Sequence, residues 1–335
     1  MSGGDRSVLE SSFGGHRYTI RDVLPNDQPE VSRLFVEAFG QQPGRDWYEW
    51  KYAAGRSAAL GLWDESGRLR AHYAGIPRTI AWQGHPVAGL QIGDVMVSPA
   101  IRGLMLRHGP FQQVCSHFFA TRVGAGRPFR FAWGFPNQRH LRLGLRLGLY
   151  HDAGVISQLN WPAKRQHLSP WWSFSPLDTN SRGFDRQVDA VWRAMAGDLT
   201  DHVVGIRDSG YVRWRFVARP DRRYRLFGLR RHVTGRLTAL AVLRFAEGAV
   251  ELLDVIGPRR VFPHVVRASL NEVADSGADA LKAWASAAVL ELARDSGAAI
   301  APSEASLAIS VGSDLPDDEI TTARWWLMGG DTDFL

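Results

Sequence analysis

The stretch GDVMVSPAIRGLMLRHGPF, residues Gly93–Phe111, decides the fold because it predicts a strand, a loop and the start of a helix. Val95–Val97 is a short apolar run suited to a buried strand, and Ser98-Pro99 ends it. Gly109-Pro110 then opens a helix that we predict over 111–122, with proline in its first turn. The rest of the chain is organised around this strand, loop and helix.

The loop between this strand and this helix suits an anion. The helix N-terminus points its unpaired N–H groups and its dipole at the loop, which also carries the guanidinium groups of Arg102 and Arg107. An apolar strand edge followed by an anion-binding turn fits a ligand with a long apolar arm and phosphate groups, and coenzyme A is such a ligand. The alternative is an ordinary strand, loop and helix with solvated arginines, and the stretch alone leaves both interpretations open.

Length and composition predict a globular chain of two domains. A chain of 335 residues is long for one domain, and a content of 45% hydrophobic and 22% charged residues allows buried cores. No apolar run in the sequence has the length of a membrane helix, and the Ser/Gly-rich lead 1–16 lacks the apolar block of a signal peptide. We therefore expect a flexible lead, a cytoplasmic protein and no membrane partner.

Cysteine usage and charge narrow the chemistry further. The single cysteine, Cys115, excludes an internal disulfide and a cysteine-cluster zinc site, and its apolar neighbours predict a core residue. No histidine pair has the spacing of a convincing metal site, so we predict no metal. A net charge of +6 and a pI near 9.8 predict an anionic partner. Nucleic acid, a membrane surface and a phosphorylated cofactor would each satisfy that charge.

Periodicity and chain-breaking residues predict elements on both sides of the central stretch. Before it we expect a strand over 18–22, a capped helix over 26–39, a short aromatic helix over 46–52, and strands over 59–63, 69–81 and 87–97. After it we expect a strand over 129–133 and a short basic helix over 137–148. The segment 161–184 is rich in Pro, Ser and Trp without periodicity, which predicts a linker.

Short motifs of the first half recur in the same order in the second half, which predicts an internal repeat. Trp47–Tyr52 is echoed by Tyr211–Phe216, Gly67–Leu69 by Gly235–Leu237, Gly93–Pro99 by Leu253–Pro258, and Ala132-Trp133 by Ala283-Trp284. The second copy keeps only Gly257–Arg260 where the first has its anion-binding loop. We therefore assign cofactor binding to the first copy.

The sequence resembles the GNAT acyltransferase superfamily in its tandem form, in which two such folds share one chain. After its fifth strand the family typically has Asn, a small residue three positions on, Tyr seven on, and Gly-Phe eleven and twelve on. This chain has Asn137, His140, Gly144 and Gly148-Leu149 at that spacing. The closing motif Trp325–Phe334 is also similar to tandem members of the family.

The resemblance implies an α/β fold of the mixed α+β kind, with two tandem GNAT-like domains that are each a twisted mixed sheet flanked by helices. The N-terminal, cofactor-binding domain would span 17–160, and the C-terminal domain, which would shape the substrate cleft, would span 185–335. The implied activity is transfer of an acetyl or other acyl group from acetyl-CoA to a primary amine of a small molecule by direct attack. The implied cofactor-binding residues are Val95, Met96, Val97, Arg102, Gly103, Leu104, Arg107, His108, Gly109 and Asn137.

Two departures from the family pattern bear on the mechanism. The phosphate turn of the family is usually RxxGxG or RxxGxA, whereas Arg102 is followed here by GLMLR, so the spaced glycines are missing. The tyrosine that often protonates the leaving thiolate is replaced by Gly144. Tyr150, His140 and Tyr73 are then candidates for the general acid, and water is another.

The general base and the role of Asn137 have alternatives of their own. Asp94 is the first choice for the base, acting directly or through water, and its alternative role is to hold a neighbouring backbone group. Asp331, Asp333 and the terminal carboxylate of Leu335 are further options for the base. Asn137 either faces the cofactor or caps the helix that follows it.

Two other functions stay open beside acetyl transfer. The altered turn is also consistent with a non-catalytic GNAT-fold binding module. A transferase of the related tandem fold that uses aminoacyl-tRNA is a third candidate, but the sequence lacks the long helical-hairpin insertion that this resemblance implies. We therefore do not expect nucleic acid as a partner, and the acceptor and the oligomeric state are left open.

Overall fold

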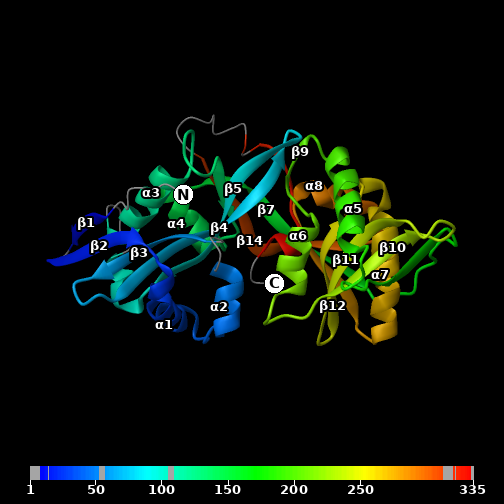
Figure 1. Ribbon diagram of the computed structural model, residues 1–335, viewed down its shortest axis with the longest axis horizontal. Coiled ribbons are helices and arrows are strands. Elements are labelled where there is room, and N and C mark those ends of the chain that lie inside the picture. The colour runs from blue at the N-terminus through cyan, green and yellow to red at the C-terminus, as the bar shows by residue number, and fades with distance from the viewer. Residues whose placement is uncertain are drawn as a thin grey trace. The chain divides into compact units, whose positions relative to one another are not determined.

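The computed structural model describes residues 8–13, 15–52, 57–104, 109–311, 320 and 322–332 of the chain (Figure 1). The chain divides into two compact units. Unit 1 consists of Met1–Arg78, Ala88–Ala153 and Leu307–Thr321, and unit 2 consists of Thr79–Val87, Gly154–Ser306 and Thr322–Leu335. Each unit is therefore assembled from three separate segments of the chain.

Unit 1 is built on a mixed sheet. The strand order is β1 (Leu9–Phe13), β2 (His16–Asp22), β3 (Ala58–Asp64), β4 (Leu69–Trp82), β5 (His85–Val97), β6 (Phe131–Gly134) and β14 (Ala299–Val311). The pairs β1–β2, β2–β3, β3–β4 and β6–β14 are antiparallel, whereas β5 and β6 are parallel. A parallel pair needs a crossover connection, and the chain between β5 and β6 contains a helix.

The helices of unit 1 follow the start and stop signals of the sequence. They are the 3-10 turn η1 (Pro25–Asp27), α1 (Gln28–Phe39), α2 (Arg45–Tyr52), the 3-10 segment η2 (Pro99–Leu104), α3 (Pro110–Arg122) and α4 (Gln138–Arg146). α1 ends at Gly40, whose left-handed backbone closes the last turn. α3 begins with Pro110 directly after its N-cap Gly109. The apolar face of α3, with Phe111, Val114 and Phe118, packs in the core of this unit.

Unit 2 repeats this plan. Its strand order is β7 (His151–Pro162), β13 (Ala280–Ala285), β12 (Ala249–Ile256), β11 (Leu237–Ala246), β10 (Arg225–Arg231) and β8 (Trp172–Pro176), and β9 (His202–Gly205) pairs with β15 (Arg324–Trp326). Its helical elements are α5 (Phe184–Asp198), α6 (Ser209–Val212) with the π-helical turn η3 (Arg213–Val217), η4 (Arg259–Val261), α7 (Phe262–Ser276), α8 (Ala287–Ala293), η5 (Arg294–Ser296) and η6 (Gly329–Asp331). As in unit 1, the central parallel pair, β12–β13, is linked by a helix, α7.

Each unit is completed by a strand that comes from elsewhere in the chain. β7 follows α4 of unit 1, yet its residues from Ser157 to Pro162 pair with β13 in unit 2. β14 follows α8 of unit 2, yet its residues from Ala308 to Val311 pair with β6 in unit 1. The strand after the last helix of each copy is thus exchanged between the two copies.

The predicted repeat is confirmed by the order of the elements. The helices α1 and α2, strands β3, β4 and β5, helix α3, strand β6 and helix α4 correspond in order to α5, α6–η3, β10, β11, β12, α7, β13 and α8. The echoed motifs fall on corresponding elements, with Trp47–Tyr52 on α2 and Tyr211–Phe216 on α6 and η3. The predicted fold class, two tandem copies of a mixed sheet with helices, is therefore confirmed.

Several local predictions were wrong. The lead 1–16 contains β1, which pairs with β2 at five positions from Leu9–Ile20 to Phe13–His16. The predicted linker 161–184 contains β8, which pairs with β10 through Trp172–Arg231 and four further positions. The strand expected over 129–133 covers 131–134. β1 forms a hairpin with the adjacent β2, whereas β8 and β6 pair with strands distant in sequence, which local composition does not reveal.

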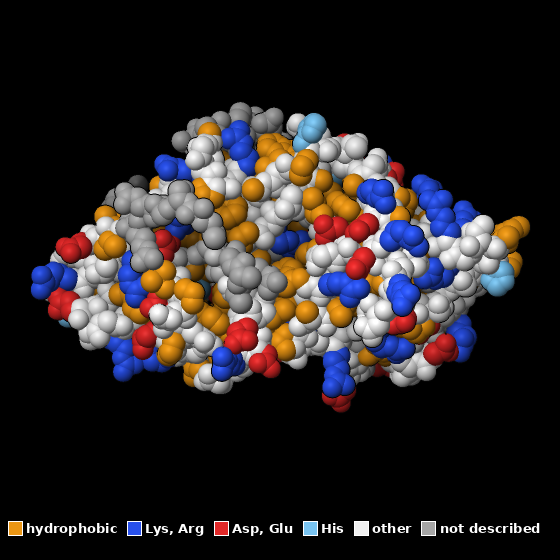
Figure 2. All heavy atoms as spheres, viewed as in Figure 1, with side chains coloured by type: hydrophobic (Ala, Val, Ile, Leu, Met, Phe, Trp, Pro, Cys, Tyr) orange, Lys and Arg blue, Asp and Glu red, His pale blue; other side chains and the backbone are white. Residues whose placement is uncertain are grey.

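Two observations concern the surface. Among the residues that the structure describes, no helix combines the length and the apolarity needed to cross a membrane. Basic side chains gather over the part of unit 2 around α5 and β10 in Figure 2, with acidic side chains among them. The positive net charge of the chain therefore lies in part on unit 2 and is not confined to the turn before α3.

Candidate active site

The candidate site of unit 1 begins where β5 and β6 stop pairing. The two strands are in register at Gly89–Phe131, Leu90–Ala132 and Gln91–Trp133. β6 ends at Gly134, whereas β5 continues to Val97. Ile92 lies beside Gly134, and the backbone of β5 from Gly93 onward therefore runs past the end of its parallel neighbour. We call the region where β5 extends past the end of β6 the notch of unit 1.

The predicted cofactor-binding strand offers its backbone rather than its side chains. Met96 is buried in a cluster with α1, whereas Val95 and Val97 pack on the opposite side, in the cluster that contains α3. This alternation is that of a strand covered on both faces. All three side chains thus pack in the hydrophobic clusters of unit 1. A ligand beside this strand would contact peptide N–H and C=O groups.

Asp94 lies at a strained bend in β5. Its φ angle is +51°, a left-handed conformation that aspartate adopts far less often than glycine. The neighbouring His72 is buried, and its Nδ1–H donates to the carbonyl oxygen of Asp94 at 2.8 Å. Burial lowers the pKa of His72 to about 4. A neutral imidazole therefore holds this bend in place at physiological pH.

The carboxylate of Asp94 forms an ion pair inside the unit. Lys51 Nζ lies 2.6 Å from Asp94 Oδ2, and the side chains of Lys51 and Asp94 are only 2% and 11% exposed. The same ammonium group lies 4.7 Å from the ring centre of Trp47. A carboxylate that is paired this closely is a weak proton acceptor. The arrangement supports the structural role of Asp94 that the sequence left open.

Tyr150 fills the space beside Gly144. A Cβ atom at Gly144 would come within 1.9 Å of Tyr150 Cδ2 and 2.3 Å of Cε2. The Tyr150 hydroxyl lies 2.6 Å from the hydroxyl of Tyr73, which is fully buried on β4. Burial raises the pKa of Tyr150 above its usual range and that of Tyr73 well above it. Both phenols are therefore protonated at neutral pH and able to donate a hydrogen bond.

Asn137 and His140 lie at the start of α4. Asn137 is the N-cap, and its side chain accepts a hydrogen bond from the backbone N–H of His140 at 3.0 Å. Asn137 thus has the capping role that the sequence left open. The His140 side chain is exposed, and partial desolvation lowers its pKa. A role of either side chain at the cofactor stays a prediction.

The predicted anion-binding turn is described only in part. Arg102, Gly103 and Leu104 have their backbones in η2, and Gly109 caps α3. Arg107 and His108 lie outside the described residues. The backbone of the turn therefore leads from the end of β5 to the N-terminus of α3, as the sequence predicted. Its contacts with phosphate stay a prediction.

The other options for the base lie elsewhere. Asp331 is 2% exposed in unit 2, where Arg207 holds it at 2.5 Å. It therefore belongs to the interior of unit 2 and not to the notch of unit 1. Asp333 and Leu335 lie outside the described residues. Among the residues that the structure describes, no group of three or more His, Cys, Asp and Glu side chains could hold a metal ion.

The sequence did not single out Lys51 or His72. Lys51 lies in an aromatic helix and has the pattern of a solvated charge, and His72 lies in a strand among apolar residues. Only the packing of α2 and β4 against β5 brings them to Asp94. One signal was present: the internal repeat places a cation at both Lys51 and Arg215, in each case between two aromatic residues.

A known protein family matches part of the chain. Residues 19–144 match the family model described as an acetyltransferase (GNAT) domain. This range covers unit 1 from β2 to α4 and so contains the notch, Asp94 and Gly144. A comparison with curated proteins gives no match.

Solved structures share the fold over most of the chain. A conserved protein of unknown function from Enterococcus faecalis V583, described as a probable N-acyltransferase, has a TM-score of 0.66 at 12% identity, covering 88% of this chain and 72% of that one. A GCN5-related N-acetyltransferase from Kribbella flavida has a TM-score of 0.61 at 16% identity, with 88% and 71% covered. Saccharomyces cerevisiae N-myristoyltransferase with bound myristoyl-CoA has a TM-score of 0.59 at 10% identity, with 91% and 85% covered. At these identities the likeness shows the fold alone.

Proposed function

We propose that the protein transfers an acyl group from an acyl-CoA to a primary amine, because residues 19–144 match the acetyltransferase (GNAT) domain family. Acetyl-CoA is the first candidate donor, and a small molecule is the first candidate acceptor. The observation that carries this proposal is the notch of unit 1, where β5 extends past β6 and leads through η2 to the N-terminus of α3.

The residues at the notch fit an acyl-CoA. The backbone of Val95, Met96 and Val97 would hold the pantetheine arm by hydrogen bonds, as a neighbouring strand would. The N-terminus of α3, together with Arg102 and Arg107, would hold the phosphates. When bound, acyl-CoA supplies an activated thioester. The N–H groups along β5 are fixed donors that can stabilise negative charge on a carbonyl oxygen beside them.

Tyr150 is the candidate general acid. Its hydroxyl is protonated at neutral pH, and Tyr73 holds that hydroxyl in place from β4. The family tyrosine belongs at position 144, and the Tyr150 ring lies against that position. We therefore propose that Tyr150 donates the proton to the leaving thiolate in place of the missing tyrosine. Lys51, His72 and Asp94 would support the reaction by fixing the bend in β5.

A panel of donors and acceptors tests the function. Acetyl-CoA, a medium-chain acyl-CoA and myristoyl-CoA are each incubated with amino sugars, amino acids and polyamines, and release of free thiol is measured. We expect amine-dependent thiol release with at least one donor. Thiol release that is absent with every donor and acceptor, together with absent binding of acyl-CoA, would favour the non-catalytic binding module that the altered turn also permits.

The Tyr150→Phe variant tests the proposed acid. Loss of a positioned proton donor lowers kcat by about 100-fold, while the KM for acyl-CoA changes little. Tyr18→Phe is the matched control, because Tyr18 is a buried tyrosine of β2 that packs in the same core. Equal kcat values for Tyr150→Phe and wild type would show that another group or water provides the proton.

A further inference from the structure

Unit 2 contains a second notch at the position that corresponds to the first. β12 and β13 are parallel and in register at Ala249–Ala280, Val250–Leu281 and Glu251–Lys282. β12 then continues to Ile256. The internal repeat places Asp254 of β12 at the position of Asp94 of β5. By its strands alone, unit 2 would be a second candidate for acyl-CoA.

The chain itself occupies this second notch. Residues Trp325–Thr332, which we call the strap, are bonded on one side to the end of β13 and the residue that follows it. Ala285 forms a β-bridge with Met328, and the backbone N–H of Ser286 donates to the carbonyl oxygen of Leu327 at 3.0 Å. The Ser286 hydroxyl donates to the carbonyl oxygen of Trp325 and accepts from the N–H of Leu327. The strap is therefore held by backbone pairing at the end of β13 and by both polar groups of Ser286.

The other side of the strap contacts β12. A Cβ atom at Gly330 would lie 3.1 Å from the carbonyl oxygen of Leu253 and 3.2 Å from Asp254 Cβ. At Gly330 the strap backbone thus lies so close to β12 that a side chain there would press against the strand. It is also paired with the end of β13, so the strap contacts both strands beyond their last parallel pair. A cavity of about 40 Å³ remains, lined in part by Leu253, Ala283, Trp284 and Gly329. A space of that size holds about one water molecule and not a pantetheine arm.

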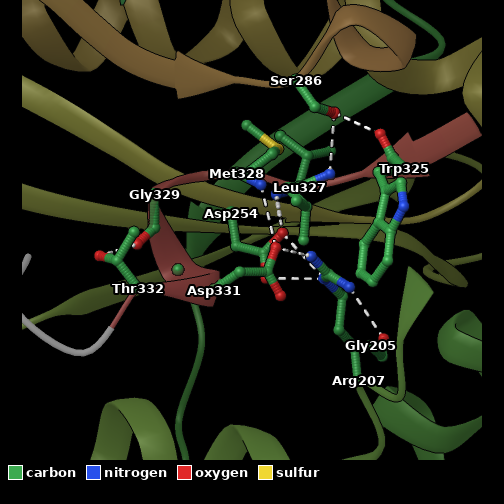
Figure 3. A network of polar contacts seen from close by, with 12 residues as sticks. Gly205, Arg207, Asp254, Ser286, Trp325, Leu327, Met328, Gly329, Asp331 and Thr332 are labelled. Atoms are coloured by element: carbon green, nitrogen blue, oxygen red, sulfur yellow. Dashed lines mark hydrogen bonds and ion pairs between the residues drawn. The ribbon is translucent and has the colours of Figure 1, made fainter. Parts of the chain in front are cut away.

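A buried ionic network fixes the strap (Figure 3). Arg207 lies 2.8 Å from Asp254 on β12 and 2.5 Å from Asp331 on the strap. All three side chains are at most 2% exposed. Asp331 also accepts a hydrogen bond from the backbone N–H of Met328 at 2.9 Å. The guanidinium group of Arg207 therefore links the strap to β12.

The two copies use corresponding positions differently. In unit 1, Lys51 of α2 pairs with Asp94. In unit 2, the corresponding residue Arg215 donates to the carbonyl oxygens of Gly330 at 3.1 Å and Thr332 at 2.6 Å. The cation of the repeated motif thus pairs with Asp94 of β5 in unit 1 and donates hydrogen bonds to the strap in unit 2.

We infer that the strap is a built-in occupant of the second notch, so that unit 2 binds no acyl-CoA and each chain binds one, in unit 1. The part of this inference that concerns unit 1 rests on the function proposed above. The part that concerns unit 2 rests on the strap alone. The experiment below separates the two.

The test combines calorimetry with hydrogen exchange on the full-length chain. Acetyl-CoA is titrated to obtain the binding stoichiometry, and exchange is followed by mass spectrometry with and without acetyl-CoA. We expect a stoichiometry of one, protection of peptides that cover β5 and the start of α3, and unchanged exchange in peptides that cover β12 and the strap. A stoichiometry of two, or altered exchange of the strap on binding, would overturn the inference.

If acetyl-CoA does not bind at all, a variant of the strap still tests the strap inference. Asp331→Ala removes the contacts of Asp331 with Arg207 and Met328 but leaves the Arg207–Asp254 pair. Exchange of strap amides should then be about tenfold faster than in wild type. Asp185→Ala, which removes an exposed ion pair with Arg213, is the control and should leave strap exchange unchanged. Absent binding with a protected strap would refute the proposed function but support the strap inference, whereas an unprotected wild-type strap would refute the strap inference.

Discussion

The ring of Tyr150 lies where a side chain at residue 144 would begin. A Cβ atom there would be 1.9 Å from Tyr150 Cδ2, so Gly144 and Tyr150 can occupy this part of unit 1 only as a pair. The family pattern has tyrosine at the position of Gly144. The chain thus keeps a phenol in this space but supplies it from six residues further on.

Gly144→Ala should disturb both stability and activity. The added methyl group overlaps the Tyr150 ring, and overpacking of this kind costs about 1–3 kcal/mol. We expect a lower midpoint of thermal unfolding and, because the phenol must move, a kcat reduced toward that of Tyr150→Phe.

Gly197→Ala is the control for that substitution. Gly197 lies in α5, and a Cβ atom there has no neighbour within 4 Å. Alanine in a helix is more favourable than glycine by about 0.5–1 kcal/mol, so the unfolding midpoint should stay or rise. Equal midpoints for Gly144→Ala and wild type would contradict the packing described for Tyr150.

Lys51→Met should destabilise unit 1. The substitution leaves the Asp94 carboxylate without its partner at 2.6 Å in a site that is 11% exposed, and loss of one member of a buried pair costs about 3–5 kcal/mol. Thermal unfolding measures the effect. Arg45→Met removes one member of an exposed pair with Glu49 and should leave the midpoint unchanged. A double variant, Lys51→Met with Asp94→Asn, should recover part of the loss.

His72 should make stability depend on pH. Its pKa is about 4 in the folded chain and 6.5 in the unfolded chain, so between these values the unfolded chain binds more protons. Stability is therefore lost as the pH falls from about 6.5 to 4, by at most about 3 kcal/mol.

His72→Gln isolates this contribution. Glutamine can still donate to the Asp94 carbonyl oxygen but does not titrate, so the unfolding midpoint of the variant should fall less than that of wild type over this range. Asp254 acts in the opposite direction, because burial raises its pKa to about 6 and its contribution is lost as the pH rises. That contribution is common to both proteins and cancels in the difference. Parallel pH profiles would show that His72 does not titrate as described.

The sequence predicted the elements whose signals are local. The breakers Ser98-Pro99 and Gly109-Pro110 bound the loop between β5 and α3 to within two residues, and the repeated motifs predicted two copies. The exchange of β7 and β14 was not predicted, because β14 pairs with β6 across 174 to 180 residues of chain and either copy could have supplied its own strand.

The candidate site was predicted less completely than the fold. Asp94, Tyr150 and Tyr73 were selected from the sequence. The pairing of Asp94 with Lys51 of α2 and of Tyr150 with Tyr73 of β4 was not predicted. A charged residue in a short helix has the same local pattern whether it is solvated or buried. Only packing of that helix against β5 distinguishes the two cases.

A crystal structure with acetyl-CoA tests the central proposal most directly. We expect one ligand per chain, with its thioester beside Val95–Val97 of β5 and its sulfur within about 3.5 Å of the Tyr150 hydroxyl. Acetyl-CoA bound in unit 2, with the strap displaced from between β12 and β13, would contradict it.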